Sequence, residues 1–110
     1  MNFQNVPFSF TDWGHVESQE FAGETGTSYW RTFSSADLRV RMVDYMPGFR
    51  ADHWCPRGHV LLVLEGELKI ELRDGRVIKL PPHTSFQVGA DDSNPHLAYT
   101  EKGAKVFIVD

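Results

Sequence analysis

The stretch HVLLVLEGELKIELRDG, residues 59–75, decides the fold of this chain. Residues 59–64 are apolar at almost every position, and a strand of that kind is covered on both of its faces. Residues 68–72 alternate apolar and charged side chains, as a strand does when only one face is buried. Asp74-Gly75 is a strong signal for a tight hairpin turn. This stretch therefore predicts two successive β-strands followed by a hairpin.

The first of these strands also predicts what surrounds it. Successive side chains of a strand point to opposite faces, so we expect His59, Leu61 and Val63 to face the core. The opposite face is also apolar and needs a second cover, supplied either by residues 1–26 or by a second copy of the chain. We therefore expect a homodimer.

The rest of the chain has the same character, with frequent turn signals and no long helical periodicity. Many short strands joined by tight turns are typical of an all-β sandwich or barrel with very little helix. We expect nine strands, at residues 28–33, 38–46, 49–55, 59–64, 68–72, 77–80, 85–88, 96–100 and 104–109.

Residues 1–26 differ from the rest because they are rich in aromatic residues and have no regular alternation. Aromatic side chains gain much from burial. We therefore interpret residues 1–26 as an extended N-terminal arm that packs on the barrel or on a partner subunit, and residues 27–110 as the barrel. The aromatic residues of the arm are Phe3, Phe8, Phe10, Trp13 and Phe21.

Composition excludes several classes of function. A length of 110 residues fits one domain, and a net charge of −4 without any run of basic residues argues against nucleic-acid or membrane-surface binding. No apolar run approaches the roughly 20 residues of a membrane span. Cys55 is the only cysteine, so no internal disulfide forms, and the start MNFQNVPFSF does not resemble a signal peptide. We expect a cytoplasmic protein.

The segment PGFRADHWCPRGH, residues 47–59, carries the chemistry. Residues two apart on a strand share a face, which places His53 beside Cys55. A three-residue turn then returns the chain, so Cys55 should lie nearly opposite His59. Imidazole and thiolate groups at this spacing suit Zn, Ni, Fe(II) or Cu better than Mg or Ca. Asp52 falls on the other face, where we expect it to pair with an arginine.

At this segment the chain resembles the cupin superfamily. The first cupin motif reads Gly, five residues, His, one residue, His, three or four residues, Glu, six residues, Gly. Here Gly48 precedes His53 by nearly that spacing. Cys55 stands at the second histidine position and His59 near the glutamate position, with Gly66 following at the expected turn.

The resemblance covers roughly residues 38–110. Within the superfamily, the chain is similar to small single-domain cupins with an Asp-His-Trp-Cys signature. Leu80-Pro81-Pro82-His83 resembles the turn of the second cupin motif, with His83 where glycine is common. Pro95-His96 resembles the segment that brings the last metal ligand. The resemblance implies a double-stranded β-helix, a cupin-like jelly-roll barrel. It also implies an internal metal held by His53, Cys55, His59 and His96.

These residues predict a metal-binding cupin that binds or transforms a small molecule at a divalent transition metal: Zn, Fe, Ni or Cu, with zinc preferred. Whether it is an enzyme is open, and no catalytic residue is assigned. The lost glutamate charge is restored by a Cys55 thiolate, so the two ligand changes compensate. Phe86, Met42 and Tyr99 are expected to line the site.

Three other interpretations stay open. All four side chains could close a structural metal site or serve ligand sensing without turnover. Cys55 could act as a nucleophile activated by His53 or His59. The same residues could also be an ordinary cluster in the core of a metal-free interaction module.

Overall fold

The computed structural model describes residues 3–110, so Met1 and Asn2 of the predicted arm lie outside the described residues. The regular secondary structure of the described residues is almost entirely β, as predicted. No helix within residues 3–110 is long and apolar enough to cross a membrane. The elements are η1 (Trp13–His15), β1 (Gln19–Ala22), β2 (Thr27–Ser35), β3 (Leu38–Tyr45), β4 (His59–Gly66), β5 (Leu68–Leu72), β6 (Val77–Leu80), β7 (Ser85–Val88), β8 (His96–Tyr99) and β9 (Ala104–Val109).

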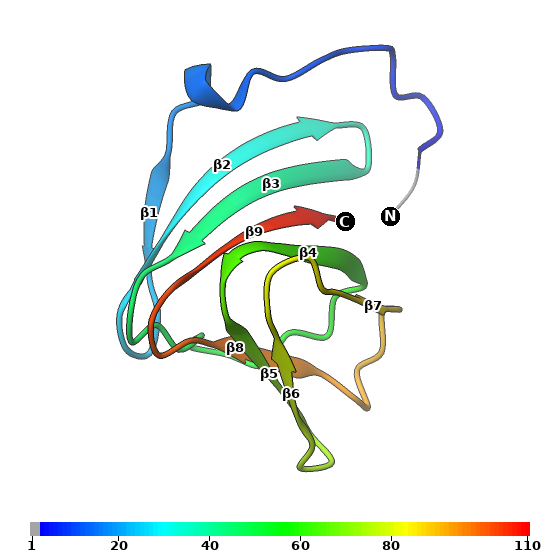
Figure 1. The fold of residues 1–110 in the computed structure, drawn as a ribbon. Coiled ribbons are helices and arrows are strands. Elements are labelled where there is room, and N and C mark those ends of the chain that lie inside the picture. Colours follow the sequence, from blue (N-terminus) through cyan, green and yellow to red (C-terminus); the bar gives the residue numbers. More distant parts are fainter. Residues whose placement is uncertain (1–2) are drawn as a thin grey trace.

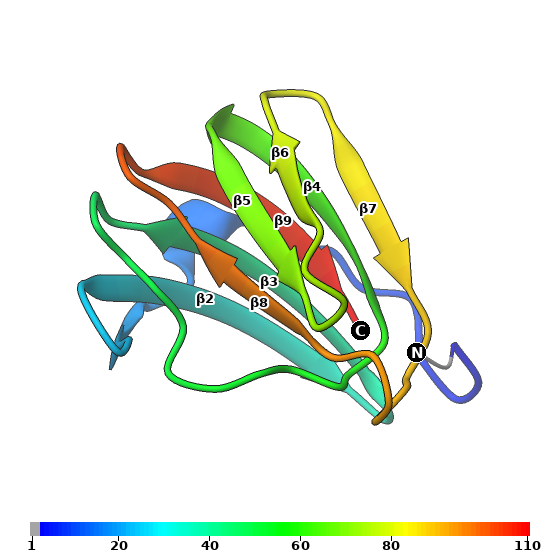
Figure 2. The ribbon, with the colours of Figure 1, turned by 90° about the horizontal axis from the view of Figure 1, so that it is seen from below.

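The strands form two antiparallel sheets that face each other (Figures 1 and 2). The large sheet has the order β1-β2-β3-β9-β4-β7, and the small sheet has the order β6-β5-β8. In the large sheet β1, β2 and β3 follow each other in sequence, whereas β9 lies between β3 and β4 and β7 pairs with β4. This arrangement is a jelly roll, which confirms the fold class predicted from the sequence.

The core lies between the inner faces of the two sheets. The predicted inward residues of β4 are confirmed, because His59, Leu61 and Val63 are all buried. They alternate with partly exposed residues on the outer face of the strand. The buried apolar cluster consists of Val43, Leu61, Val63, Leu68, Ile70, Leu80, Ala104, Val106 and Ile108.

One predicted strand, residues 49–55, is a loop instead. Its backbone makes isolated bridges to β8 at Arg50 and Cys55, and Arg50 also bridges to Thr25. Ala51 also donates its N–H to the carbonyl of Ala98 in the small sheet. The segment therefore runs beside β8 with interrupted pairing, because five steps from Arg50 to Cys55 match only three steps from Tyr99 to His96. The loop packs Phe49 into the interior, and a buried apolar side chain of this kind is also typical of a strand.

The described part of the arm contains a strand that the sequence pattern did not indicate. β1 pairs with β2 along its whole length and extends the large sheet. Farther back, Trp13 packs edge-on against Phe107 of β9 and so covers part of the outer face of that sheet. Phe8 and Phe10 have no such cover and are 95% and 87% exposed.

The turn after β4 predicts a sharp difference between two glycine substitutions. Gly66 and Gly75 both have positive φ, which costs an L-residue roughly 1–2 kcal/mol. A Cβ on Gly66 would also collide with the carbonyl of Gly103, whereas Gly75 has open space. We expect Gly66→Ala to lower the free energy of unfolding by about 1–3 kcal/mol more than Gly75→Ala in urea titrations. Equal losses would contradict the collision.

Candidate metal centre

Three of the four residues predicted to hold a metal come together at one point in the core. Cys55 comes from the loop before β4, His59 begins β4 and His96 begins β8. One potential ligand atom from each lies within 4.8 Å of those of the other two. Both histidines are buried and Cys55 is half-buried. The group therefore combines donors from a loop and from both sheets.

The partner of Cys55 differs from the one predicted. The sequence pattern placed Cys55 opposite His59 in a hairpin, but the antiparallel bridge joins Cys55 to His96. The Cys55 N–H donates to the His96 carbonyl at 2.7 Å, and the His96 N–H donates to the Cys55 carbonyl at 3.0 Å. Bridged residues present their side chains to the same side, so the thiol and imidazole are neighbours.

His53 is not part of this group. Its side chain is 75% exposed, and its Nδ1 lies 2.6 Å from Oδ1 of Asp52. This hydrogen bond lowers the pKa of Asp52. The predicted pairing of Asp52 with an arginine is therefore replaced by a pairing with its neighbour. The expected alternation fails here because residues 49–55 are not extended as a strand.

The two buried imidazoles suit a cation. Nε2 of His59 and Nε2 of His96 are 3.0 Å apart. Two nitrogens bound at about 2.0–2.1 Å to a tetrahedral ion lie about 3.3 Å apart, so only a small separation is needed. Burial lowers the pKa of His59 to about 4, with His96 acting in the same direction and Asp110 opposing both. Burial also lowers the pKa of His96. Both rings are neutral near pH 7, as metal ligands must be.

A buried carboxylate stands behind His59. Oδ2 of Asp110 lies 3.5 Å from Nδ1 of His59, a distance at which the attraction is electrostatic and no well-formed hydrogen bond exists. A carboxylate in this position favours the tautomer with its proton on Nδ1, which leaves the Nε2 lone pair for an ion. Asp110 is itself held by Arg39 and Arg41, at 2.9 and 3.1 Å.

The group opens onto a cavity of about 560 Å³ between the two sheets. Phe86 lines it and lies edge-on to both histidine rings. Met42 and Tyr99, which were expected beside it, do not line the cavity. Met42 pairs in register with Phe107 on the outer face, and the ring of Tyr99 lies under Arg50.

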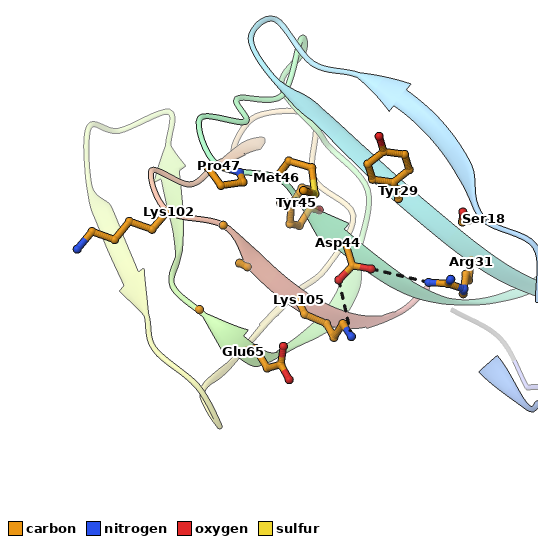
Figure 3. Close-up of a pocket in the computed structure, with 13 residues that line it drawn as sticks. Ser18, Tyr29, Arg31, Asp44, Tyr45, Met46, Pro47, Glu65, Lys102 and Lys105 are labelled. Atoms are coloured by element: carbon orange, nitrogen blue, oxygen red, sulfur yellow. Dashed lines mark ion pairs between the residues drawn. The ribbon is translucent and has the colours of Figure 1, made fainter. Parts of the chain in front are cut away.

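A second hollow of about 600 Å³ lies on the outer side of the large sheet (Figure 3). Its central charge, Asp44, is paired with Arg31 at 3.8 Å and with Lys105 at 3.9 Å, as the dashed lines show. None of its lining residues is a cysteine or a histidine. The group of potential metal ligands thus lies at the inner cavity.

Sequence reasoning missed the arginines that line the inner cavity. Arg39 and Arg41 are two residues apart on β3 and therefore share its inner face. That spacing was a visible signal, but buried arginines are uncommon unless they are paired. Their partner, Asp110, lies about 70 residues away in sequence.

Comparison of structures identifies the fold. An RmlC-like cupin from Shewanella frigidimarina is similar, with a TM-score of 0.77 at 18% identity over 96% of this chain and 92% of that one. A cupin-superfamily sugar phosphate isomerase from Silicibacter pomeroyi gives 0.71 at 17% identity, over 92% and 74% of the two chains.

A third similar structure, hydroxypropylphosphonic acid epoxidase from S. wedmorenis, gives a TM-score of 0.72 at 15% identity. This chain is covered to 96% but spans only 61% of the epoxidase. At the level of sequence, no family model matches the chain and no curated protein does. The chain therefore has the cupin fold, as its motifs predicted.

The low pKa of His59 predicts acid sensitivity in the metal-free protein. The pKa of a histidine in the unfolded chain is near 6.5, whereas the pKa of His59 in the folded protein is about 4. Between these two pH values the unfolded state binds a proton that the folded state does not bind, so acid favours unfolding. Stability should fall by up to about 3 kcal/mol as the pH drops through this window. Thermal melts of chelator-treated protein across this window measure the loss.

His59→Gln should flatten this dependence of Tm on pH, whatever it does to Tm itself. The matched control is His15→Gln, because His15 is exposed. If both variants keep the slope of the unmodified protein, His59 is not the group responsible.

Proposed function

We propose that Cys55, His59 and His96 hold a divalent transition metal and that a small molecule reaches it through the inner cavity. The observation that carries this proposal is the convergence of three donor atoms within 4.8 Å on the wall of that cavity. Ligand sites in proteins are typically concave, largely apolar and about 300–1,000 Å³ in volume, with a few polar groups. The inner cavity has these properties.

The donor set limits the choice of metal. Thiolate and imidazole ligands suit zinc, iron, nickel and copper, whereas Mg²⁺ and Ca²⁺ prefer oxygen. We place zinc first because zinc is bound in proteins by both thiolate and imidazole ligands. Fe(II) is the alternative that the comparisons suggest, since a similar solved structure is that of an Fe(II) enzyme. A lone thiol ligand suits a reducing compartment, and we propose a cytoplasmic location.

Three protein side chains leave one coordination position of the metal open to a small molecule. An open position favours binding or catalysis over a purely structural role. A bound metal would act there as a Lewis acid toward an oxygen of the ligand. The protein contributes the rest. Phe86 and the apolar wall exclude water, and Asp110 keeps the proton of His59 on Nδ1.

A non-enzymatic role is the second candidate, and one observation favours it. His53 lines the same cavity even though its side chain points to solvent. If it rotated inward as a fourth ligand, it would close the site into a structural or ligand-sensing centre. The two roles differ in whether His53 is needed for the metal.

Zinc affinity and zinc content measure directly whether His53 is needed for the metal. We expect Cys55→Ser, His59→Gln and His96→Gln each to reduce zinc affinity by about 10-fold or more, because each removes a direct ligand. His53→Gln is the matched control and should leave affinity and stoichiometry unchanged. Competition with a chromophoric chelator gives the affinities, and elemental analysis gives the stoichiometry.

Two results would change the proposal. Unchanged zinc affinity in Cys55→Ser would remove the thiolate from the site and with it the metal centre as described. A loss in His53→Gln equal to that in His96→Gln would favour the closed, four-ligand site over the open one.

We also propose that the protein is a homodimer, as expected from the sequence. Phe8 and Phe10 support this, because two large apolar side chains close together in the arm are almost fully exposed. Such patches on soluble chains usually mark interfaces. A second copy of the chain could bury them against the outer face of its large sheet, where Leu62 and Phe107 pair in register.

Light scattering tests the dimer. The unmodified chain should have twice the 12.6 kDa mass of one copy, and the double variant Phe8→Ser with Phe10→Ser should shift toward the monomer. Val77→Ser with Ile78→Ser removes exposed apolar residues of β6 and is the control. A monomeric mass for the unmodified chain at micromolar concentration would refute the dimer.

A further inference from the structure

Three arginines line the same cavity as the proposed metal centre. Arg39 and Arg41 come from β3, and Arg57 lies in the loop between Cys55 and His59. Arg57 approaches Oδ2 of Asp110 at 3.9 Å, and that same oxygen lies 3.5 Å from His59. The guanidinium groups are therefore linked to the metal-ligating histidine through a single carboxylate.

The charges around the cavity do not balance. Two carboxylates face the three guanidinium groups, namely the buried Asp110 and the exposed Asp52 at the rim. The side chains around the cavity therefore carry a net positive charge, and Asp52 is already engaged with His53 at 2.6 Å. A divalent metal with one thiolate ligand would add further positive charge.

The three arginines differ in how many of their N–H donors are free of hydrogen bonds within the protein. Arg39 binds Asp110 through two parallel hydrogen bonds, at 2.9 and 3.0 Å, so one edge of its fork is used. Arg41 has a side chain only 6% exposed and gives one hydrogen bond to Asp110. Among the described residues its buried Nε has no acceptor. A buried donor without a partner is costly unless a ligand satisfies it.

Arg57 has the most freedom. Its side chain is 57% exposed, and its contact with Asp110 is at ion-pair distance. Since Asp110 is already bound at close range by the other two arginines, Arg57 gains little from it. An exposed guanidinium group without a close hydrogen-bond partner can bind an incoming oxyanion through two of its N–H donors.

We infer that the ligand of this cavity is a small organic anion whose carboxylate or phosphate group is bound by Arg57, with Arg41 beneath it. This inference deepens the proposed function, since it names the class of molecule that reaches the metal centre. The cavity is also lined by apolar residues, with Ile108 paired in register with Arg41 and with Leu61, Ile70 and Phe86 beyond it. The ligand therefore has a charged head group and a short apolar body.

Binding of simple probes to the chelator-treated protein tests the inference without the metal. The probes are isobutyrate, isobutyl phosphate and the neutral isobutyramide, titrated by chemical-shift changes of the backbone amides. We expect at least one anion to bind about 10-fold tighter than the amide, because charge-assisted hydrogen bonds are stronger than neutral ones. The tighter anion identifies the head group.

Arg57→Gln should weaken binding of that anion by about 10-fold. The control is Arg76→Gln, which removes the same charge from a side chain that is 64% exposed and paired with Asp74 outside the cavity. It should leave the affinity unchanged. Equal binding of the anions and the amide, or equal effects of the two arginine variants, would overturn the inference.

The metal centre and the anion site can fail separately. A Cys55→Ser protein that has lost zinc affinity but still binds the anion supports both. If the unmodified protein binds no zinc but binds the anion through Arg57, the anion site survives and the metal centre does not. If it binds zinc but none of the anions, the metal centre survives and the anion site is refuted.

Discussion

The backbone bridge between Cys55 and His96 is the interaction on which the candidate site depends. Its two hydrogen bonds join a loop to the first residue of β8, at 2.7 and 3.0 Å. β8 is itself paired with β5 in the small sheet, whereas His59 belongs to the large sheet. The three donors therefore come from parts of the chain that are held by different sheets. An ion bound to all of them would fasten the sheets together at one end of the barrel.

Asp110 is the second constraint, and it acts through charge. Burial acts to raise the pKa of its carboxyl group, but hydrogen bonding and charge from Arg39 and Arg41 outweigh burial and hold the pKa below its ordinary value. The carboxylate therefore stays ionised in the interior. Because it is ionised, it can hold the two arginines in place while it faces His59. Loss of this one carboxylate would leave buried positive charge without compensation.

The sequence was sufficient for the parts of the fold that rest on local patterns. The alternation in β5 and the inward face of β4 were predicted because they depend on a two-residue period. Residues 49–55 were mistaken for a strand because their pairing with β8 is interrupted: Arg50 bridges Tyr99 and Cys55 bridges His96, so five steps along the segment match three along β8. The predicted position of His53 beside Cys55 was wrong for the same reason. The arginines around Asp110 were missed because no local pattern connects residues about 70 positions apart.

The order of groups along the cavity wall limits how a bound anion could meet the metal. Arg57 lies 3.9 Å from Asp110, Asp110 lies 3.5 Å from His59, and His59 lies 3.0 Å from His96. These contacts are successive and short. The contact with Asp110 is made at Nδ1 of His59 and the contact with His96 at its Nε2, so the imidazole ring joins the arginine cluster to the proposed metal position. A charge bound at Arg57 would therefore act on the proposed metal through Asp110 and the His59 ring, as partners behind a metal ligand do.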